Sequence, residues 1–406
     1  MPRLLHAIES LNPAYGGTVE SALQLAGALE ARGVTNEMVT LDSPSDQWRQ
    51  SFIADEAIHR VGPPVTFYRY CAKLSRWLVG NLGRFDAVIV HGLWRHHNAG
   101  VWLASRRTAT PRYLIAHSML NPWFNESDRF KQFRKTLYWW ALEHRTLRDA
   151  HAVVFSSEQE RTEAAGSFWP YRCREAVTPF GTGDPAPADE EVFLDRFPHL
   201  RKKRRLLFLG RLHPMKGCDL LIRAFGNADS EDADAQLILA GPDSVGWRPE
   251  LEAIAKGLGL EGRVTFTGPL GGAEKWSALR GADLFVLPSH CESASYSTME
   301  SLGCSTPVLI TDKVNIFREL IGRECAVVVA DTEASVCEGL RRWLGKQDDR
   351  GRQRADARRC FEERFHIERT AEAFLELLRG DLGWGPDCQA EAGSTAPPIS
   401  ARSVSQ

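Results

Sequence analysis

The sequence predicts an α/β protein built from two doubly wound domains with parallel sheets. Short apolar runs alternate with amphipathic segments along most of the chain, which is typical of strands joined by crossover helices. The alternation is interrupted once, at residues 181–189, where glycine and proline are frequent, and this indicates a linker. A chain of 406 residues has room for two or three domains.

The expected elements follow this order in both halves. In the first half we expect strands near 3–8, 36–41, 86–91, 112–117, 151–156 and 174–179. The first crossover helix is expected from Val19 to Arg32, ending at Gly33, because glycine commonly terminates helices. The second half restarts at 205–210 and continues with strands near 236–240, 263–267, 283–287, 306–310 and 325–330.

Composition indicates a soluble globular enzyme. Hydrophobic residues make up 43% and charged residues 25%, and the net charge of −2 argues against nucleic acid binding by bulk electrostatics. The 9 cysteines are scattered without a C-x-x-C pair, which favours reduced thiols. We find no signal-peptide pattern and no apolar run of about 20 residues, so we expect a cytoplasmic protein. Residues 383–406 hold few large apolar side chains and are predicted to be disordered.

The most informative segment is 288–307, directly after the strand expected at 283–287. Glu292 lies in a loop, and Glu300 follows eight residues later in an expected helix. A loop between a strand and a helix lies at the carboxyl edge of a parallel sheet, where open α/β folds bind ligands. One carboxylate can therefore meet a ligand in the loop, and the other can hold a diol such as a ribose.

Cations follow the strand at 205–210. Arg211 and Lys216 come after Gly210 and before an expected helix at Cys218. An arginine can bind a phosphate through two parallel hydrogen bonds, and a lysine adds a point charge. Two solvated surface cations are the plain alternative, and the spacing to Glu292 and Glu300 argues against it.

Two further motifs lie in the first half. The adjacent glycines Gly16 and Gly17 would let the backbone approach a ligand at a helix start, although a tight turn would use them equally well. His117 ends an expected strand, and His91 has the same placement, so its role stays open. His91, His96 and His97 lack a carboxylate or cysteine at usable spacing, so no metal site is predicted.

Taken in order, these motifs resemble those of retaining glycosyltransferases of family 4, the glycosyl transferases group 1, which have the GT-B fold. The resemblance covers residue 3 to about 378 and rests on the Gly16-Gly17 loop, His117, the 210–217 segment and the E-x7-E pattern of 292–300. It implies two Rossmann-like domains facing a cleft. The N-terminal domain, 1–180, would bind the acceptor, and the C-terminal domain, 181–364, the nucleotide sugar. The last helix, near 365–382, would return to the first domain.

The resemblance also implies the site residues. Donor binding would involve Gly16, Gly17, Gly210, Arg211, Lys216, Glu292, Ser293, Ala294, Ser295 and Glu300. Catalysis would involve His117, Arg211, Lys216 and Glu292. Glu300 would hold the ribose, while Glu292 and His117 would meet the transferred sugar. The two cations would replace a divalent metal, so neither a metal nor a cofactor is expected.

The chain departs from the family pattern in two places. The usual Gly-Phe-Gly after the first glutamate is Ser293-Ala294-Ser295, and the usual Cys-Gly before Thr-Pro is Cys304-Ser305. Residues with a Cβ reach fewer backbone conformations than glycine. The alternative function is therefore a catalytically degenerate GT-B protein that binds glycan or a partner. A phosphorylase would need a pyridoxal-binding lysine motif, and none is found.

Two remaining segments have patterns that could bind other ligands. Asp232 and Asp234 match a D-x-D string, but they precede an expected strand and read as a solvated acidic run. Residues 129–142 mix four cations with Phe130, Phe133, Tyr138, Trp139 and Trp140. Such a helix can lie on an anionic membrane surface, or its aromatic rings can pack on the sheet. The first alternative would fit a peripheral enzyme at the inner membrane face that extends lipid-linked glycans in cell-surface polysaccharide or glycolipid assembly.

Overall fold

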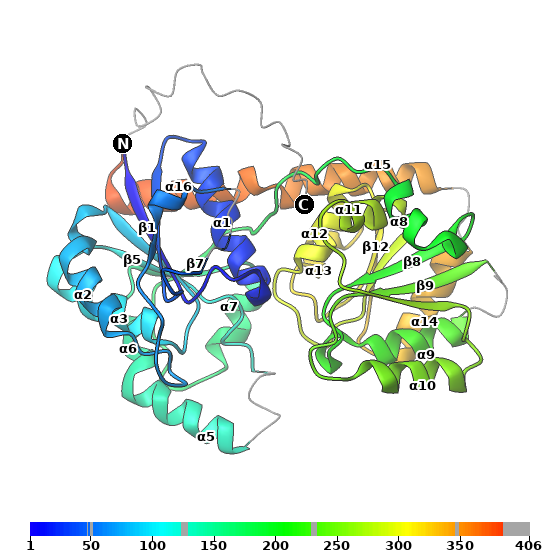
Figure 1. The fold of residues 1–406 in the computed structure, drawn as a ribbon, viewed down its shortest axis with the longest axis horizontal. Helices are drawn as coiled ribbons and strands as arrows, with labels where there is room; N and C mark the ends of the chain where they lie inside the picture. Colours follow the sequence, from blue (N-terminus) through cyan, green and yellow to red (C-terminus); the bar gives the residue numbers. More distant parts are fainter. Residues whose placement is uncertain (47, 49–51, 123–128, 229–233, 346–348, 385–406) are drawn as a thin grey trace. The chain divides into compact units, whose positions relative to one another are not determined.

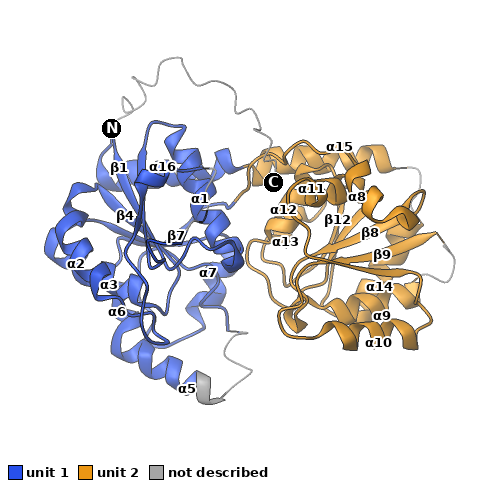
Figure 2. Cartoon of the chain, viewed as in Figure 1, with its two compact units in different colours: residues 1–180, 367–402 blue, residues 181–366, 403–406 orange. Residues whose placement is uncertain are grey.

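The computed structural model describes residues 1–46, 48, 52–122, 129–228, 234–345 and 349–384, and within them the chain forms two compact α/β units. Unit 1 comprises Met1–Phe180 and the segment that begins at Ile367, and unit 2 comprises Gly181–His366 (Figure 2). The prediction of two parallel-sheet α/β domains is confirmed. The tail expected to be disordered lies outside the described residues from 385 onward.

Unit 1 contains, among its described residues, a seven-stranded parallel sheet (Figure 1). Its strand order is β3-β2-β1-β4-β5-β6-β7. The strands are β1 (Arg3–Ile8), β2 (Thr35–Thr40), β3 (Ile58–Arg60), β4 (Ala87–His91), β5 (Arg112–Ile115), β6 (Ala152–Phe155) and β7 (Glu175–Val177). The helices are α1 (Gly17–Glu30), α2 (Ala72–Asn81), α3 (His96–Thr108), α5 (Arg129–Tyr138), α6 (His144–Arg148), α7 (Glu158–Ala165) and α16 (Ile367–Leu382).

Strand β3 was missed by the sequence analysis. It is three residues long and lies at the edge of the sheet, where it pairs only with β2 among the described strands. A segment this short, with a histidine and an arginine following its single isoleucine, carries too little of an apolar pattern to be recognised.

Polar contacts hold α16 against the sheet of unit 1. Both carboxylate oxygens of Asp381 accept hydrogen bonds from the Arg174 guanidinium at 2.7 Å. One of them also accepts from the Tyr113 hydroxyl, on β5, at 3.0 Å. Near the start of the helix, Arg32 donates to the backbone carbonyl of Glu368 at 3.1 Å. These contacts explain why the last helix belongs to unit 1 although the chain reaches it from unit 2.

Unit 2 contains, within the described ranges, a six-stranded parallel sheet of order β10-β9-β8-β11-β12-β13. The strands are β8 (Arg204–Leu209), β9 (Ala235–Ala240), β10 (Val264–Gly268), β11 (Leu284–Leu287), β12 (Val308–Thr311) and β13 (Ala326–Val329). The helices are α8 (Glu191–Arg196), α9 (Cys218–Ala228), α10 (Arg248–Gly257), α11 (Gly272–Gly281), α12 (Tyr296–Gly303), α13 (Phe317–Leu320), α14 (Glu333–Leu344) and α15 (Arg350–Cys360).

The order of strands in unit 2 creates a switch point between β8 and β11. The chain leaves β8 toward β9 on one side, whereas β11 leads to β12 on the other. At such a point the loops that follow the two neighbouring strands diverge and leave room for a ligand. All of β11 is buried, and so are the central residues 206–208 of β8, as expected for a parallel sheet covered on both faces.

No helix of the described part of the chain is long and apolar enough to cross a membrane.

Candidate active site

The loops that follow β8 and β11 are joined by close backbone contacts. Gly217 has a φ of 65°, and a Cβ at this position would lie 2.2 Å from the carbonyl oxygen of Pro288. The His290 amide donates to the Met215 carbonyl at 2.9 Å. Gly217 therefore lets the segment with the two predicted cations reach the segment with the two predicted glutamates.

Lys216 and Glu292 form an ion pair across this junction. Their side chains are only 14% and 16% exposed, so the pair is shielded from solvent. Burial, and next the charge of Arg211, lower the pKa of Lys216 to about 8. Two residues predicted separately from the sequence are thus in direct contact.

The backbone of Glu292 is held firmly in place. Its amide donates to the Lys313 carbonyl at 3.0 Å, and its carbonyl accepts from the Asn315 amide at 2.9 Å. The carboxylate therefore projects from a fixed point beyond the end of β11.

Arg211 lies at the same edge with its side chain exposed. It follows Gly210 directly at the end of β8, and its charge acts on both Lys216 and His213. Among the described residues, we find no hydrogen bond or ion pair made by its guanidinium. An exposed cation beside a buried one gives this edge an excess of positive charge suited to an anion.

Glu300 lies inside α12 and is buried. Its partner is a lysine that was not predicted from the sequence. The Lys275 ammonium, from α11, donates to Glu300 Oε1 at 2.6 Å. Lys275 also lies 4.3 Å from the ring centroid of Trp276. No sequence motif indicates this pair, because α11 reaches α12 only through tertiary packing.

The three residues that replace the usual Gly-Phe-Gly do not adopt a glycine conformation here. None of Ser293, Ala294 and Ser295 has a positive φ. Ser295 instead caps α12: its hydroxyl accepts from the Thr298 amide at 3.3 Å and lies 2.7 Å from the Thr298 hydroxyl. Ser305 does take up the left-handed conformation, with a φ of 62°, where glycine would be favoured.

In unit 1 the predicted glycines lie where β1 gives way to α1. Gly16 has φ 64° and ψ −132°, and α1 begins at Gly17. A Cβ on Gly16 would meet nothing within 4 Å, so the backbone conformation rather than crowding requires the glycine. The two residues thus open a helix of 14 residues whose first amides are available to a ligand.

His117 lies at the carboxyl edge of the unit 1 sheet, two residues beyond β5. It has a φ of 48°, and its ring is 3.2 Å, nitrogen to nitrogen, from that of His91. Burial lowers the pKa of His117 to about 3, so the ring is neutral at neutral pH.

A buried carboxylate that the sequence analysis missed, Glu160, holds the loop of His117. Its Oε1 accepts from the Ser118 amide at 2.6 Å and from the Ser118 hydroxyl at 3.2 Å. Its Oε2 accepts from the Ser156 amide at 2.7 Å and from the Ser156 hydroxyl at 2.6 Å. Glu160 therefore links the loops that follow β5 and β6. The sequence does not indicate this role, because a glutamate in the first turn of a helix is common.

The described side chains do not form a metal site. The described residues contain no group of three or more His, Cys, Asp or Glu side chains that could hold a metal ion. Asp232 of the D-x-D string lies outside the described residues, and Asp234 is paired with Lys203 at 2.6 Å.

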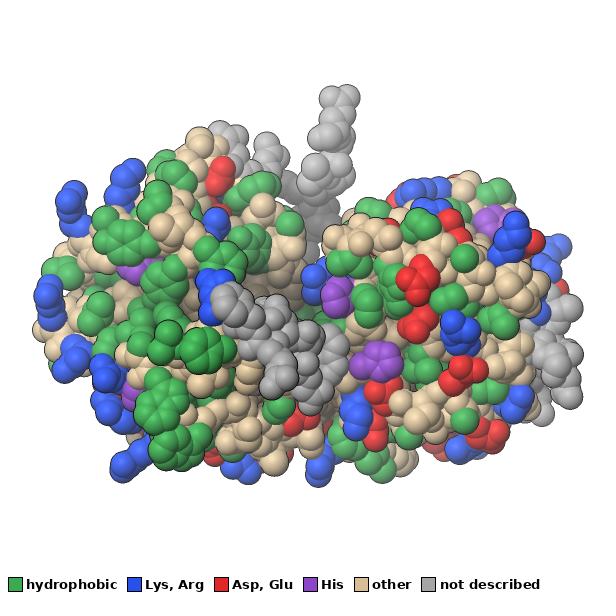
Figure 3. Space-filling model, turned by 90° about the horizontal axis from the view of Figure 1, so that it is seen from below, with side chains coloured by type: hydrophobic (Ala, Val, Ile, Leu, Met, Phe, Trp, Pro, Cys, Tyr) green, Lys and Arg blue, Asp and Glu red, His purple; other side chains and the backbone are tan. Residues whose placement is uncertain are grey.

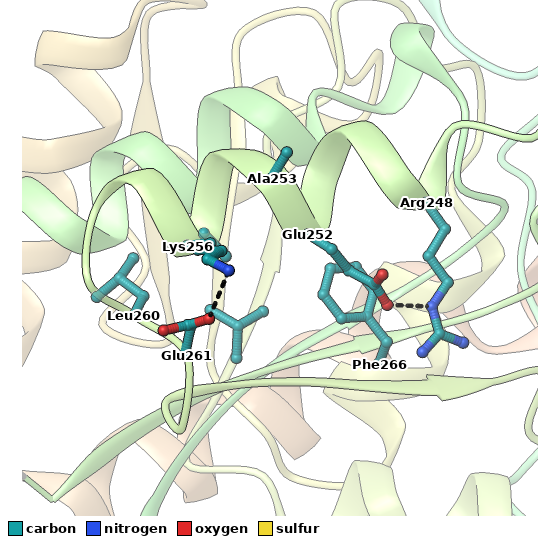
Figure 4. A pocket seen from close by; sticks show the side chains of 9 residues that line it. Arg248, Glu252, Ala253, Lys256, Leu260, Glu261 and Phe266 are labelled. Atoms are coloured by element: carbon teal, nitrogen blue, oxygen red, sulfur yellow. Dashed lines mark hydrogen bonds and ion pairs between the residues drawn. The ribbon is translucent and has the colours of Figure 1, made fainter.

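A surface hollow of about 410 Å³ lies along α10 and β10, away from the residues described above. Its charged side chains pair with one another: Arg248 with Glu252 at 2.7 Å, and Lys256 with Glu261 at 3.8 Å (Figure 4). None of the predicted site residues lines it.

Two family descriptions match the chain, one for each half. Residues 16–181 match the glycosyl transferase 4-like domain, and residues 190–359 match the glycosyl transferases group 1. Among related sequences, the D-inositol 3-phosphate glycosyltransferase of Kineococcus radiotolerans is 27% identical over 406 residues, covering 90% of each chain. That of Actinosynnema mirum is 27% identical over 319 residues, covering 72% of this chain and 75% of its own.

Solved structures share the fold at low sequence identity. Sucrose-phosphate synthase from Thermosynechococcus elongatus has a TM-score of 0.76 at 18% identity and covers 94% of this chain and 99% of its own. Anabaena HepE in complex with UDP-glucose has a TM-score of 0.73 at 15% identity, with 94% and 100% covered. These are GT-B glycosyltransferases. The chain belongs to the group 1 glycosyltransferases of family 4 and is a transferase enzyme.

We expect Glu160→Gln to destabilise unit 1. Each carboxylate oxygen of Glu160 accepts two hydrogen bonds. The amide nitrogen of glutamine cannot accept a hydrogen bond, so the groups that donate to the oxygen it replaces would lose their acceptor. Leaving buried groups unpaired costs about 1–3 kcal/mol each, so the free energy of unfolding should fall by at least about 2 kcal/mol in urea denaturation. The matched control is Glu158→Gln, at an exposed position of the same helix, which should change it by less than about 0.5 kcal/mol. Equal effects of the two substitutions would contradict the linking role of Glu160.

Proposed function

We propose that this transferase moves a sugar from a nucleoside-diphosphate sugar to an acceptor hydroxyl, with retention at the anomeric carbon. The observation that carries the proposal is the junction at the β8–β11 switch point, where Arg211, Lys216 and Glu292 meet at the carboxyl edge of one sheet. An exposed and a buried cation fit a diphosphate, and a neighbouring carboxylate fits the sugar attached to it.

The chemistry needs positive charge at this place. When the bond between the anomeric carbon and the β-phosphate oxygen breaks, its electron pair stays on the phosphate. Arg211 and Lys216 would stabilise that growing charge, and cations positioned in advance contribute strongly to such catalysis. The acceptor hydroxyl forms the new bond to the anomeric carbon and passes its proton to the leaving phosphate oxygen on the same face. No protein nucleophile is then needed, and the stereochemistry is retained.

The ion pair of Lys216 with Glu292 suggests what happens when the donor binds. The diphosphate would replace Glu292 as the partner of Lys216 and release the carboxylate toward the transferred sugar. His117, at the edge of the unit 1 sheet, is proposed to contact that sugar. Gly17 would offer its amide to the ligand, while Gly16, whose amide donates to the Pro13 carbonyl at 2.9 Å, would let the backbone approach the ligand. Unit 2 would hold the nucleoside diphosphate of the donor, and unit 1 is proposed to bind the acceptor.

Nucleotide-sugar binding is supported by the solved structures named above, since HepE is described in complex with UDP-glucose. UDP is therefore the first nucleotide to test, beside GDP and ADP. The related sequences are named as D-inositol 3-phosphate glycosyltransferases, which supports a polar hydroxyl acceptor. We propose a glycan or lipid-linked sugar acceptor and a role in polysaccharide or glycolipid assembly.

A membrane-facing position is supported by the surface around α5. Phe133, Leu137 and Trp140 follow one another at helical spacing and are 66%, 62% and 48% exposed. Trp169, 73% exposed, lies against Trp140 with ring centroids 5.2 Å apart. The other alternative holds for Trp139, which is buried and donates to the Pro170 carbonyl at 2.9 Å. Tyr138 also packs inward, since its hydroxyl donates to that of Tyr68 at 2.8 Å.

We call Phe133, Leu137, Trp140 and Trp169 the aromatic face. Figure 3 shows apolar side chains gathered over this side of unit 1, with cations at its margin. Arg134 lies in α5 itself, and Lys135 stacks on Trp94 at 5.4 Å. Exposed apolar side chains beside cations match the interface of an anionic bilayer, so we propose a peripheral enzyme at the cytoplasmic side of the membrane.

The first prediction separates the two glutamates. Glu300→Ala should weaken binding of the product nucleoside diphosphate by about 1.5–3 kcal/mol, because buried hydroxyls lose a charged acceptor. Glu292→Ala should not weaken it, since the carboxylate competes for Lys216, but should depress turnover at the reacting sugar. Calorimetric titration with UDP, GDP and ADP, beside assays of sugar transfer and donor hydrolysis, measures both effects. Glu338→Ala, at an exposed position of unit 2, serves as the control. Equal binding losses in Glu292→Ala and Glu300→Ala would refute the division of roles.

The second prediction concerns metal ions. If Arg211 and Lys216 stabilise the leaving diphosphate, transfer should continue in excess EDTA at the rate measured without it. Arg211→Ala and Lys216→Ala should each lower turnover by about 10²–10³ while the protein stays folded. A complete loss of activity in EDTA that Mg²⁺ or Mn²⁺ restores would show that the cations do not suffice.

The third prediction tests the aromatic face. The protein should sediment with vesicles of phosphatidylcholine and phosphatidylglycerol and much less with phosphatidylcholine alone. The triple variant Phe133→Ser/Leu137→Ser/Trp140→Ser should bind the anionic vesicles at least about tenfold more weakly, because it loses apolar area that would enter the interface. The control is Ile321→Ser, at an exposed apolar position of unit 2. Unchanged vesicle binding of the triple variant would rule out this surface.

A further inference from the structure

Four polar side chains form a continuous hydrogen-bonded row inside unit 1. Asn36 Oδ1 is 3.1 Å from His6 Nε2, His6 Nδ1 is 3.0 Å from His91 Nε2, and His91 Nδ1 is 3.2 Å from His117 Nε2. The His6 and His91 rings stack with centroids 5.3 Å apart, and the His91 and His117 rings with centroids 5.5 Å apart. No motif in the sequence connects these residues.

The strand register explains how the row arises. Its members come from β2, β1, β4 and the loop after β5, which are neighbours in that order. Asn36 is aligned with Leu4, two residues before His6, and His91 is aligned with Ile8, two residues after it. Ile115, two residues before His117, is aligned with His91. Each step therefore advances two residues and stays on one face, so the row runs diagonally to the carboxyl edge.

The direction of the first hydrogen bond follows from the surroundings of Asn36. Its Nδ2 lies 3.1 Å from the Ala26 carbonyl and 2.8 Å from the Val34 carbonyl, and carbonyl oxygens only accept. The amide nitrogen must face them, which leaves Oδ1 to face His6. His6 Nε2 must therefore carry a proton and donate it.

The same direction passes along the row because the rings are neutral. Burial lowers the pKa of His6 to about 4, and the pKa of His91 well below its ordinary value. A neutral imidazole carries one N–H, so His6 Nδ1 can only accept and His91 Nε2 must donate. By the same argument His91 Nδ1 accepts from His117 Nε2. Nδ1 of His117 is then left as an acceptor.

Backbone contacts keep the last two rings in place. His97 Nε2 lies 2.9 Å from the His91 carbonyl, which ties the end of β4 to α3. Glu160 holds Ser118 directly beside His117. Among the described residues, we find no hydrogen-bond partner for His117 Nδ1.

We propose that Asn36, His6 and His91 are positioning residues that hold His117 as its Nε2–H tautomer, so that Nδ1 accepts a hydrogen bond from a hydroxyl of the sugar substrate. A ring held in this form cannot donate from Nδ1 to a phosphate or a carboxylate. The assignment of a sugar hydroxyl rests on the proposed function, whereas the tautomers depend only on the fold of unit 1.

Nitrogen-15 NMR of the full chain with labelled histidine tests the tautomers without any substrate. Two-bond proton–nitrogen correlations distinguish protonated from bare ring nitrogens, and His6→Gln, His91→Asn and His117→Gln assign the signals. We expect protonated Nε2 and bare Nδ1 in His6, His91 and His117 between pH 6 and 8, a range of ordinary working conditions. A protonated Nδ1 in His117 would overturn the inference, whether or not the chain is an active transferase.

A matched pair of substitutions tests the coupling. His91→Asn can still present an oxygen close to the place of Nδ1, whereas His91→Leu has nearly the same shape and cannot accept. His91→Leu should alter the His117 nitrogen signals and lower kcat by about 10–100-fold, the range found for partners that orient metal-bound histidines. His91→Asn should retain the His117 tautomer and most of the turnover.

His199→Gln, in unit 2, controls for general effects of losing a histidine. A His117 spectrum unchanged in His91→Leu would show that the row does not set the tautomer. If His91→Leu changes the His117 spectrum but keeps the wild-type kcat, the hydrogen bond that His117 is proposed to accept from a sugar hydroxyl does not contribute to transfer. Product formation by the wild-type protein, measured in the same assays, separates either result from a failure of the proposed function.

Discussion

The parallel pairing of β8 with β11 is the constraint on which the candidate site of unit 2 depends. Parallel strands end at the same edge, so residues far apart in the chain emerge side by side. Lys216 and Glu292 meet for this reason, and Gly217 allows the last close approach because it lacks a Cβ that would strike Pro288. The excess of cations at this edge follows from where β8 ends and not from the net charge of the chain.

The replaced glycines show how a family pattern can change without loss of the local fold. Ser295 supplies a helix cap through its side chain, so the turn before α12 is stabilised by a hydrogen bond in place of glycine's freedom. Ser305 accepts a left-handed conformation at the end of the same helix. Glu300 keeps its place between these two serines, buried and paired with Lys275.

Unit 1 illustrates the demands of buried polar groups. The interior of a parallel sheet is apolar, so each polar side chain within it needs partners. Asn36, His6 and His91 satisfy one another across three strands, and Glu160 satisfies four donors between two loops. Such networks are rigid because the loss of one member leaves another unpaired. The first network ends at His117, and the second holds Ser118, the residue next to it.

The fold class, twelve of the described strands and the places of the main cations and carboxylates along the chain could be predicted from the sequence. Periodicity of apolar residues and local motifs act over short distances, so they are visible in a single chain; β3 escaped because it is too short to have a period. Tertiary structure alone decided the partners. Lys275 reaches Glu300, Glu160 reaches Ser118, and His6 reaches His91 through strand order and register. These contacts depend on how sheets and helices pack, and they cannot be predicted from the spacing of the residues along the chain.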